Sequence, residues 1–128
     1  HNVYLLGKDK NLERQYKSIL KIDSITSLLG KTSLIEATYL LSLADLAVTN
    51  DSGLMHITAS LDTKLISIFG SSSPFYTPPL MKDMLGEVIY KGLKCSPCFK
   101  RECPLDHLNC LNNISVDEIF KKSLKYLN

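Results

Sequence analysis

Short apolar segments alternate with helix-like segments along this chain, and the alternation narrows the choice of folds. Strands that are apolar along most of their length are typical of a parallel sheet covered by helices. The pattern therefore predicts an α/β fold, with a mostly parallel sheet and helices on both faces. The strand candidates are residues 2–6, 24–29, 46–49, 64–69 and 87–90.

Two capping boxes mark the beginnings of helices. In residues 33–36 (Ser-Leu-Ile-Glu) and 115–118 (Ser-Val-Asp-Glu), the serine hydroxyl and the last glutamate are each placed to accept a free backbone N–H. Further helices are predicted at residues 8–20 and 53–61, the second of them buried. The two capped helices carry apolar stripes at three- and four-residue steps: Leu34, Ala37, Leu40, Leu41 and Ala44, and Val116, Ile119, Phe120, Leu124 and Leu127.

Length and charge limit what the chain can be. The 128 residues suffice for one domain. Fifteen Lys and Arg against thirteen Asp and Glu leave a net charge of +2, too weak a field to indicate a nucleic-acid partner. No apolar run of about 18 residues is present, so no membrane span is predicted. Because the chain opens on His1 rather than Met, we expect a piece of a longer protein.

The loop after the third strand is the strongest candidate for a ligand site. Ligands of open parallel sheets bind beyond the carboxyl ends of the strands. The helix predicted to begin at Gly53 offers unpaired N–H groups and the positive end of its dipole, and a glycine lets an anion approach the backbone. Asp51 can accept hydrogen bonds from sugar hydroxyls, and His56 lies one turn in. The same residues can also be explained without a ligand. In that interpretation Ser52 is an ordinary N-cap and His56 is a surface or core group.

Five motifs that follow one another in order carry a family resemblance. The motifs are residues 30–34 (Gly-Lys-Thr-Ser-Leu), 48–56 (Val-Thr-Asn-Asp-Ser-Gly-Leu-Met-His), 68–74 (Ile-Phe-Gly-Ser-Ser-Ser-Pro), 77–80 (Thr-Pro-Pro-Leu) and 95–105 (Cys-Ser-Pro-Cys-Phe-Lys-Arg-Glu-Cys-Pro-Leu). Together they resemble the lipopolysaccharide heptosyltransferases, most nearly the ADP-heptose:lipopolysaccharide heptosyltransferase II type.

The resemblance implies a bacterial glycosyltransferase built from two Rossmann-like domains. Residues 1–128 would form the single C-terminal, donor-binding domain, with a cysteine-bearing loop at 91–114 and a helix at the end. Its partners would be the donor ADP-heptose, the lipopolysaccharide core acceptor and the missing N-terminal domain, with no nucleic acid and no cofactor. The expected cellular location is the cytoplasm, at the cytoplasmic face of the inner membrane, with peripheral association to that membrane.

The same resemblance assigns roles to single residues. Asp51 would bind the heptose hydroxyls, and the backbone of Ser52 and Gly53 would hold the diphosphate. His56 would lie beside the phosphates and Thr32 near the adenosine. The catalytic carboxylate of the family lies in the other domain, so no catalytic residue and no activity are expected of this chain alone.

An acidic group for the ribose is also expected near the first helix. Asp9 or Glu13 fits that place, and both fit equally well as solvated charges on an exposed helix.

Four cysteines fall close together at Cys95, Cys98, Cys103 and Cys110, with His107 among them. They suit a structural zinc site, because a two-residue gap lets both sulfurs of the first pair face one ion. Disulfides are the second possibility, disfavoured in a reducing cytoplasm. Reduced thiols that pack as small apolar groups are the third, and no residue is assigned here as a metal ligand.

Two further features and one rival function remain open. The loop at residues 71–73 (Ser-Ser-Ser) either lines the cleft near the donor's sugar or the acceptor, or is a flexible connection. Lys94, Lys100 and Arg101 either touch the phosphorylated acceptor or an anionic lipid surface, or are simply solvated. The rival function is a non-catalytic nucleotide- or zinc-binding interaction module whose cysteine loop serves a partner protein.

Overall fold

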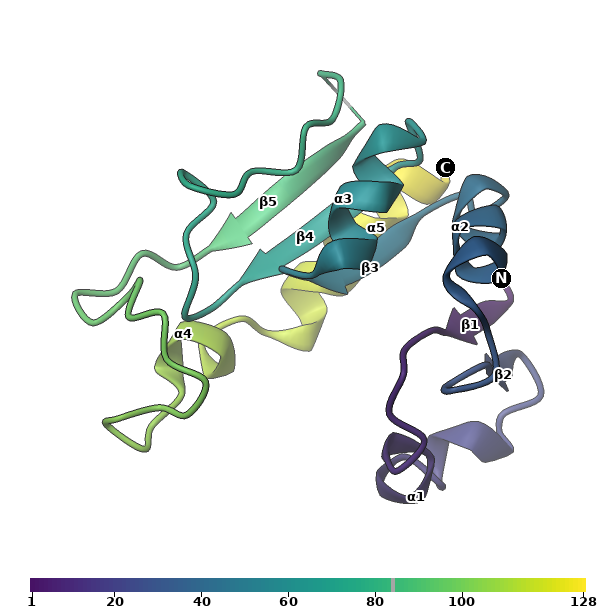
Figure 1. Ribbon diagram of the computed structural model, residues 1–128, viewed down its shortest axis with the longest axis horizontal. Helices are drawn as coiled ribbons and strands as arrows, with labels where there is room; N and C mark the ends of the chain where they lie inside the picture. Colours follow the sequence, from purple (N-terminus) through teal and green to yellow (C-terminus); the bar gives the residue numbers. More distant parts are fainter. Residues whose placement is uncertain (84) are drawn as a thin grey trace. The chain divides into compact units, whose positions relative to one another are not determined.

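The computed structural model describes residues 1–83 and 85–128 and divides into two compact units, His1–Leu40 and Leu41–Asn128. Figure 1 traces both along the chain. Within the described residues, no helix has the length and apolar character needed to cross a membrane.

The first unit is built on two parallel strands. β1 (Val3–Leu5) pairs with β2 (Ile25–Ser27), with Val3 opposite Ile25. Between them lie a one-turn helix, α1 (Leu12–Gln15), and a short 3₁₀ helix, η1 (Ile19–Lys21). The two strand candidates at residues 2–6 and 24–29 are thus confirmed in shortened form.

The continuous helix predicted at residues 8–20 is wrong. The Asp9 carboxylate accepts the N–H of Asn11 at 2.8 Å, so the chain first makes a turn and the helix begins only at Leu12. Neither α1 nor η1 contains a buried residue. A short helix in water depends on packing of one face against the protein, and without such packing this segment breaks into two pieces.

α2 (Leu34–Ser42) begins with the predicted capping box. The Glu36 carboxylate accepts the Ser33 backbone N–H at 2.7 Å, and the Ser33 hydroxyl accepts the Glu36 N–H at 3.2 Å. Hydrogen bonds from the Ser33 N–H, which has the larger effect, and from the Ser33 hydroxyl stabilise the charged carboxylate. The pKa of Glu36 therefore lies below its ordinary value. The predicted apolar stripe is buried at Ala37 and Leu41 but exposed at Leu34.

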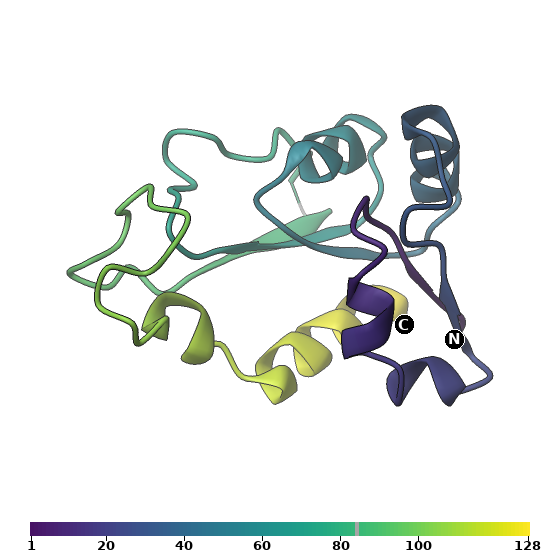
Figure 2. The ribbon, with the colours of Figure 1, turned by 60° about the horizontal axis from the view of Figure 1, so that its bottom comes forward.

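The second unit is a three-stranded parallel sheet. The strands β3 (Ala47–Asn50), β4 (Leu65–Phe69) and β5 (Gly86–Tyr90) lie in the order β3-β4-β5. α3 (Gly53–Ser60) and α5 (Val116–Leu127) cover opposite faces of this sheet, as Figure 2 shows. The predicted α/β class, with parallel strands and helices on both faces, is confirmed here.

The core of this unit forms around β4. Phe69 packs with Met55 of α3 on one face, and Ile66 packs with Ile89 and Tyr126 on the other. α3 is buried at Met55 but exposed at His56 and at its last residue, so the expectation of a wholly buried helix holds for one side only.

The cysteine-bearing segment is less irregular than predicted. Residues 91–114 contain a one-turn helix, α4 (Asn109–Asn112), where only a loop is expected. Nδ1 of His107 accepts the Asn109 N–H at 3.0 Å, and the His107 carbonyl accepts from the Asn112 side chain at 2.9 Å. His107 therefore fixes the start of a short helix. The sequence pattern does not reveal this role of His107.

The stripe predicted for α5 is only partly buried. Val116 and Phe120 are 84% and 60% exposed, whereas Tyr126, which lies outside the predicted stripe, is buried. The exposed members line an open apolar groove with Ile68 of β4 and Leu111 of α4. Ser115 caps the helix by accepting the Glu118 N–H at 3.1 Å, but the Glu118 carboxylate pairs with Lys91 at 2.8 Å. The second capping box is thus half formed.

Candidate functional site

The carboxyl ends of β3, β4 and β5 meet at one edge of the second unit's sheet, because the three strands are parallel. The segments that follow them begin at Asp51, Gly70 and Lys91. Ligands of parallel sheets bind at this edge, so the loop between β3 and α3 lies where a ligand site is expected.

The N-terminus of α3 is not capped by its own side chain. Ser52 is extended, with φ −159° and ψ 169°, and its hydroxyl makes no capping hydrogen bond. That hydroxyl lies 3.4 Å from the Thr49 hydroxyl. The first N–H groups of a helix have no partner within the helix and carry the positive end of its dipole. An anion placed here would therefore meet unsatisfied donors.

Space is open at the first residue of α3. A side-chain carbon added at Gly53 would meet no atom within 4 Å. Among the described residues, no side chain therefore occupies the space beside Gly53, and the backbone there can be approached closely.

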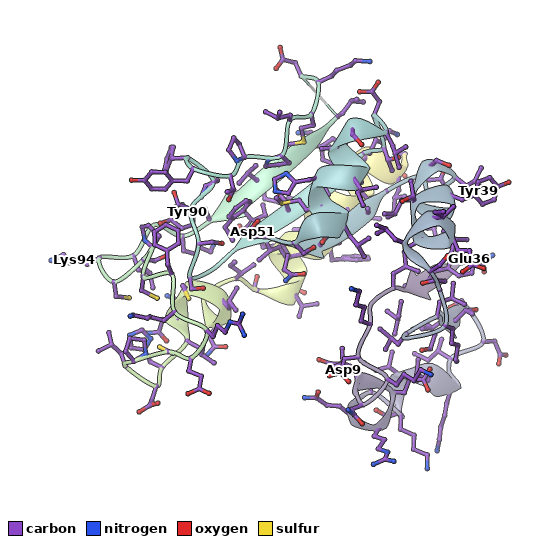
Figure 3. All side chains as sticks on the ribbon, viewed as in Figure 1. Asp9, Glu36, Tyr39, Asp51, Tyr90 and Lys94 are labelled. Carbon is purple, nitrogen blue, oxygen red and sulfur yellow. The ribbon has the colours of Figure 1, made fainter. Side chains whose placement is uncertain are left out.

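Asp51 lies directly before this helix start and is half-buried. Its backbone N–H donates to the Ile68 carbonyl at 3.1 Å, which fixes the loop to β4. No hydrogen bond or ion pair joins its carboxylate to any of residues 1–83 or 85–128. Figure 3 labels Asp51 beside the beginning of α3. His56 is exposed one turn further along the helix.

Thr32 lies in the first unit, half-buried in the turn before the N-cap Ser33. Gly30 forms that turn with φ +63°, a conformation that glycine adopts without strain. The structure thus brings four of the predicted residues together at the start of α3 and places Thr32 at the start of α2.

The two acidic candidates of the first unit have different surroundings. Asp9 is used in the turn before α1. Glu13 of α1 accepts the Ser27 hydroxyl at 2.6 Å and Nζ of Lys31 at 2.9 Å. The hydrogen bond from Ser27, followed by that from Lys31, lowers the pKa of Glu13. Sequence reasoning missed the grouping of Glu13, Ser27 and Lys31, since their spacing carries no recognisable motif.

The serine loop after β4 has a structural use. Ser73 is buried, its hydroxyl accepts the Phe75 N–H at 3.2 Å, and its carbonyl accepts the Tyr76 N–H at 3.2 Å. The Ser71 carbonyl accepts the Phe99 N–H at 2.8 Å, which ties this loop to the cysteine-bearing segment. These contacts favour a shaped connection over a flexible one.

All four cysteines are free and half-buried. Among the residues that the structure describes, no three His, Cys, Asp or Glu side chains gather as a metal-ligand set. The N–H groups of Leu108, Leu105 and His107 surround the Cys103 sulfur and lower the pKa of its thiol.

Comparison with known proteins decides the family. The family model described as glycosyltransferase family 9 (heptosyltransferase) matches residues 1–109. The chain belongs to glycosyltransferase family 9. The resemblance found in the five sequence motifs is therefore confirmed.

Several similar proteins are named as heptosyltransferases. Lipooligosaccharide heptosyltransferase 2 of Campylobacter jejuni (serotype O:2) is 28% identical over 132 residues, covering 99% of this chain and 41% of that protein. Lipopolysaccharide heptosyltransferase 2 of Salmonella typhimurium is 39% identical over 85 residues, covering 62% of this chain and 24% of that protein. The chain thus spans about two fifths of the length of the first of these relatives.

A solved heptosyltransferase structure has the same fold. The structure of the E. coli ADP-heptose LPS heptosyltransferase II superposes with a TM-score of 0.76 at 28% identity, covering 99% of this chain and 36% of that one. The predicted Rossmann-like α/β class agrees with this match.

Proposed function

We propose that residues 1–128 are the donor-binding domain of a heptosyltransferase that transfers heptose from ADP-heptose to the core of lipopolysaccharide. The observation that carries the proposal is the uncapped and open beginning of α3 at Ser52 and Gly53. Family membership and the named relatives support the reaction class.

The donor diphosphate would lie against the first N–H groups of α3. Asp51, whose carboxylate has no partner among the described residues, would accept hydrogen bonds from the heptose hydroxyls. His56 would approach the phosphates from the first turn. Thr32 would contact the adenosine, and Asp9 or Glu13 would bind the ribose hydroxyls.

The reaction would be an inverting transfer. An acceptor hydroxyl would attack the anomeric carbon of heptose, a carboxylate of the N-terminal domain would take its proton, and ADP would leave. In this scheme the chain contributes no catalytic residue. It would stabilise the charge that develops on the departing diphosphate through the N–H groups beside Ser52 and Gly53.

The acceptor and the cellular location of the enzyme follow from the same proposal. The acceptor would be the core of lipopolysaccharide, and the enzyme would work in the cytoplasm, attached peripherally to the cytoplasmic face of the inner membrane. The N-terminal domain, supplied by the rest of the protein, would complete the site.

Titration of the full-length protein with ADP and ADP-heptose by calorimetry tests the proposal. Losing hydrogen bonds to a charged group costs about 1.5–3 kcal/mol, so Asp51→Ala should weaken ADP-heptose binding about 10- to 100-fold. Gly53→Val should weaken the binding of both ADP and ADP-heptose, because the added side chain would occupy the open space beside the backbone of residue 53. Asp45→Ala, an exposed carboxylate before β3, is the matched control and should bind normally.

Wild-type affinity in both Asp51→Ala and Gly53→Val would refute the assignment of the site. Failure of the wild type to bind either nucleotide, together with stoichiometric zinc in the purified protein, would favour the interaction module instead.

A further inference from the structure

Three large aromatic side chains are exposed on two loops of the second unit. Phe75 and Tyr76, in the loop after β4, are 84% and 77% exposed, and Phe99, in the cysteine-bearing segment, is 61% exposed. The rings of Tyr76 and Phe99 meet edge to face at 5.9 Å between centroids. Exposed apolar groups gathered in this way indicate an interaction site.

The two loops are held together, so the three rings are displayed on a fixed support. The Phe99 N–H donates to the Ser71 carbonyl at 2.8 Å, and the Ser96 hydroxyl donates to the Gly70 carbonyl at 2.6 Å. Phe75 also meets Tyr90, the last residue of β5, at 6.4 Å between centroids. Because Gly70 and Tyr90 mark the carboxyl ends of β4 and β5, the rings stand at the edge of the sheet that also holds Asp51.

Positive charge lies in the same segment. Lys94, Lys100 and Arg101 are exposed, and none forms an ion pair with a carboxylate in the described parts of the chain. Figure 3 shows Lys94 at the outer end of its loop, pointing away from the sheet. By contrast, Lys91 and Lys122 are both paired with carboxylates. These three cations are thus available to a partner.

We propose that this aromatic–basic surface (Phe75, Tyr76, Phe99, Lys94, Lys100 and Arg101) docks on an anionic phospholipid bilayer. Aromatic rings prefer the interface of a bilayer, and lysine and arginine are attracted to its anionic headgroups. A water-soluble phosphate compound would engage the cations but would leave Phe75 and Phe99 without an apolar partner. The mixture of rings and cations therefore favours the bilayer.

The proposal rests on the proposed function and deepens it. Docking at this edge would hold the open start of α3 close to the membrane, where a lipid-anchored acceptor is presented. A transferase that meets its acceptor on a surface gains from this attachment, since the acceptor is then concentrated near the donor.

Vesicle flotation of the full-length protein tests the surface. Vesicles of phosphatidylethanolamine with phosphatidylglycerol should bind the protein, and vesicles of phosphatidylcholine alone should bind it much less. Binding should weaken as salt is raised, because salt screens the cations. Replacing Lys94, Lys100 and Arg101 with alanine should lower the partition coefficient by about fivefold per cation.

The aromatic variant gives an independent readout. Phe75→Ser, Tyr76→Ser and Phe99→Ser together should reduce binding at low and high salt alike, because ring insertion does not depend on screening. Lys121→Ala and Val116→Ser, both exposed on α5, are the matched controls and should bind vesicles as the wild type does. Circular dichroism of each variant checks that it is folded.

Retained binding in both loop variants, or equal binding to both kinds of vesicle, would overturn the proposal. Full displacement of the vesicles by a soluble phosphorylated core oligosaccharide would also overturn it, since the surface would then bind the acceptor rather than the bilayer. Calorimetry with ADP and ADP-heptose distinguishes a failure of the docking proposal from a failure of the donor-site proposal. Loop variants that bind ADP normally but no longer bind vesicles support the docking surface, while loss of ADP-heptose binding in Asp51→Ala concerns only the donor site.

Discussion

The Ser52 hydroxyl lies 3.4 Å from the Thr49 hydroxyl and does not cap the helix that Ser52 precedes. At the start of α5 the same residue type behaves differently, because the Ser115 hydroxyl accepts the Glu118 N–H at 3.1 Å. One helix start is closed by its own side chain. At the other, at the edge of the sheet where ligands bind, the Gly53 and Leu54 N–H groups have no partner among the described residues.

This contrast predicts unequal effects of two serine-to-alanine changes. Ser115→Ala should lower the free energy of unfolding by about 1 kcal/mol, because a capping hydrogen bond is lost. Ser52→Ala should change it by less than about 0.5 kcal/mol, since no capping bond exists there. Urea unfolding of both variants measures the difference, and equal losses would contradict it.

Two glycine-to-alanine changes should also differ. A side-chain carbon at Gly86 would stand 2.0 Å from the Leu65 carbonyl oxygen, so β4 and β5 must move apart. We expect Gly86→Ala to destabilise the fold by about 1–3 kcal/mol. Gly53→Ala, which meets nothing within 4 Å, should be neutral or slightly stabilising. Thermal unfolding followed by circular dichroism compares them, and a stable Gly86→Ala would refute the close approach.

Stability should depend on the ionisation of Glu87. Its carboxylate accepts hydrogen bonds from Lys122 and from Lys125, which lower its pKa below the ordinary value of 4.5. A lowered folded-state pKa stabilises the protein above the unfolded value, and this contribution is lost as the pH falls through the folded pKa. Glu87→Gln should therefore cost about 1 kcal/mol at neutral pH and nearly nothing at about pH 3.

Urea unfolding of wild type and Glu87→Gln at both pH values gives this difference. Glu102→Gln is the control, because Glu102 is exposed and pairs with none of the residues in the described ranges. A cost for Glu87→Gln that persists at low pH would assign the effect to packing rather than to charge.

Cys103 should be the most reactive thiol of the four. Its pKa is lowered because the N–H groups of Leu108, Leu105 and His107 stabilise the thiolate, which is the reactive form. At neutral pH and with limiting iodoacetamide, we expect Cys103 to be modified about threefold or more faster than the others. Mass spectrometry of the digested protein reads each site, with Cys103→Ser as the control. Faster modification of Cys95 or Cys98 would contradict the prediction.

Much of the candidate site is contiguous in sequence, which is why sequence reasoning could find it. Asp51, Ser52, Gly53 and His56 lie on one loop and the helix that follows it. The grouping of Glu13 with Ser27 and Lys31 is different, because hydrogen bonds join residues 14 and 18 positions apart. No spacing rule predicts such a group, and only the fold of the first unit forms it.

The amino-acid sequence by itself determined where most strands and helices begin, because capping residues, glycine stops and apolar runs act over a few neighbouring residues. Tertiary structure decided what these elements bury: Tyr126 is inside while Val116 is 84% exposed, although both lie on α5. Tertiary structure also decided that the predicted helix at residues 8–20 is split into two short helices, and that Glu118 forms an ion pair with Lys91. The physical reason is that burial and charge pairing depend on which distant segments arrive at a surface, and the local sequence does not contain that information.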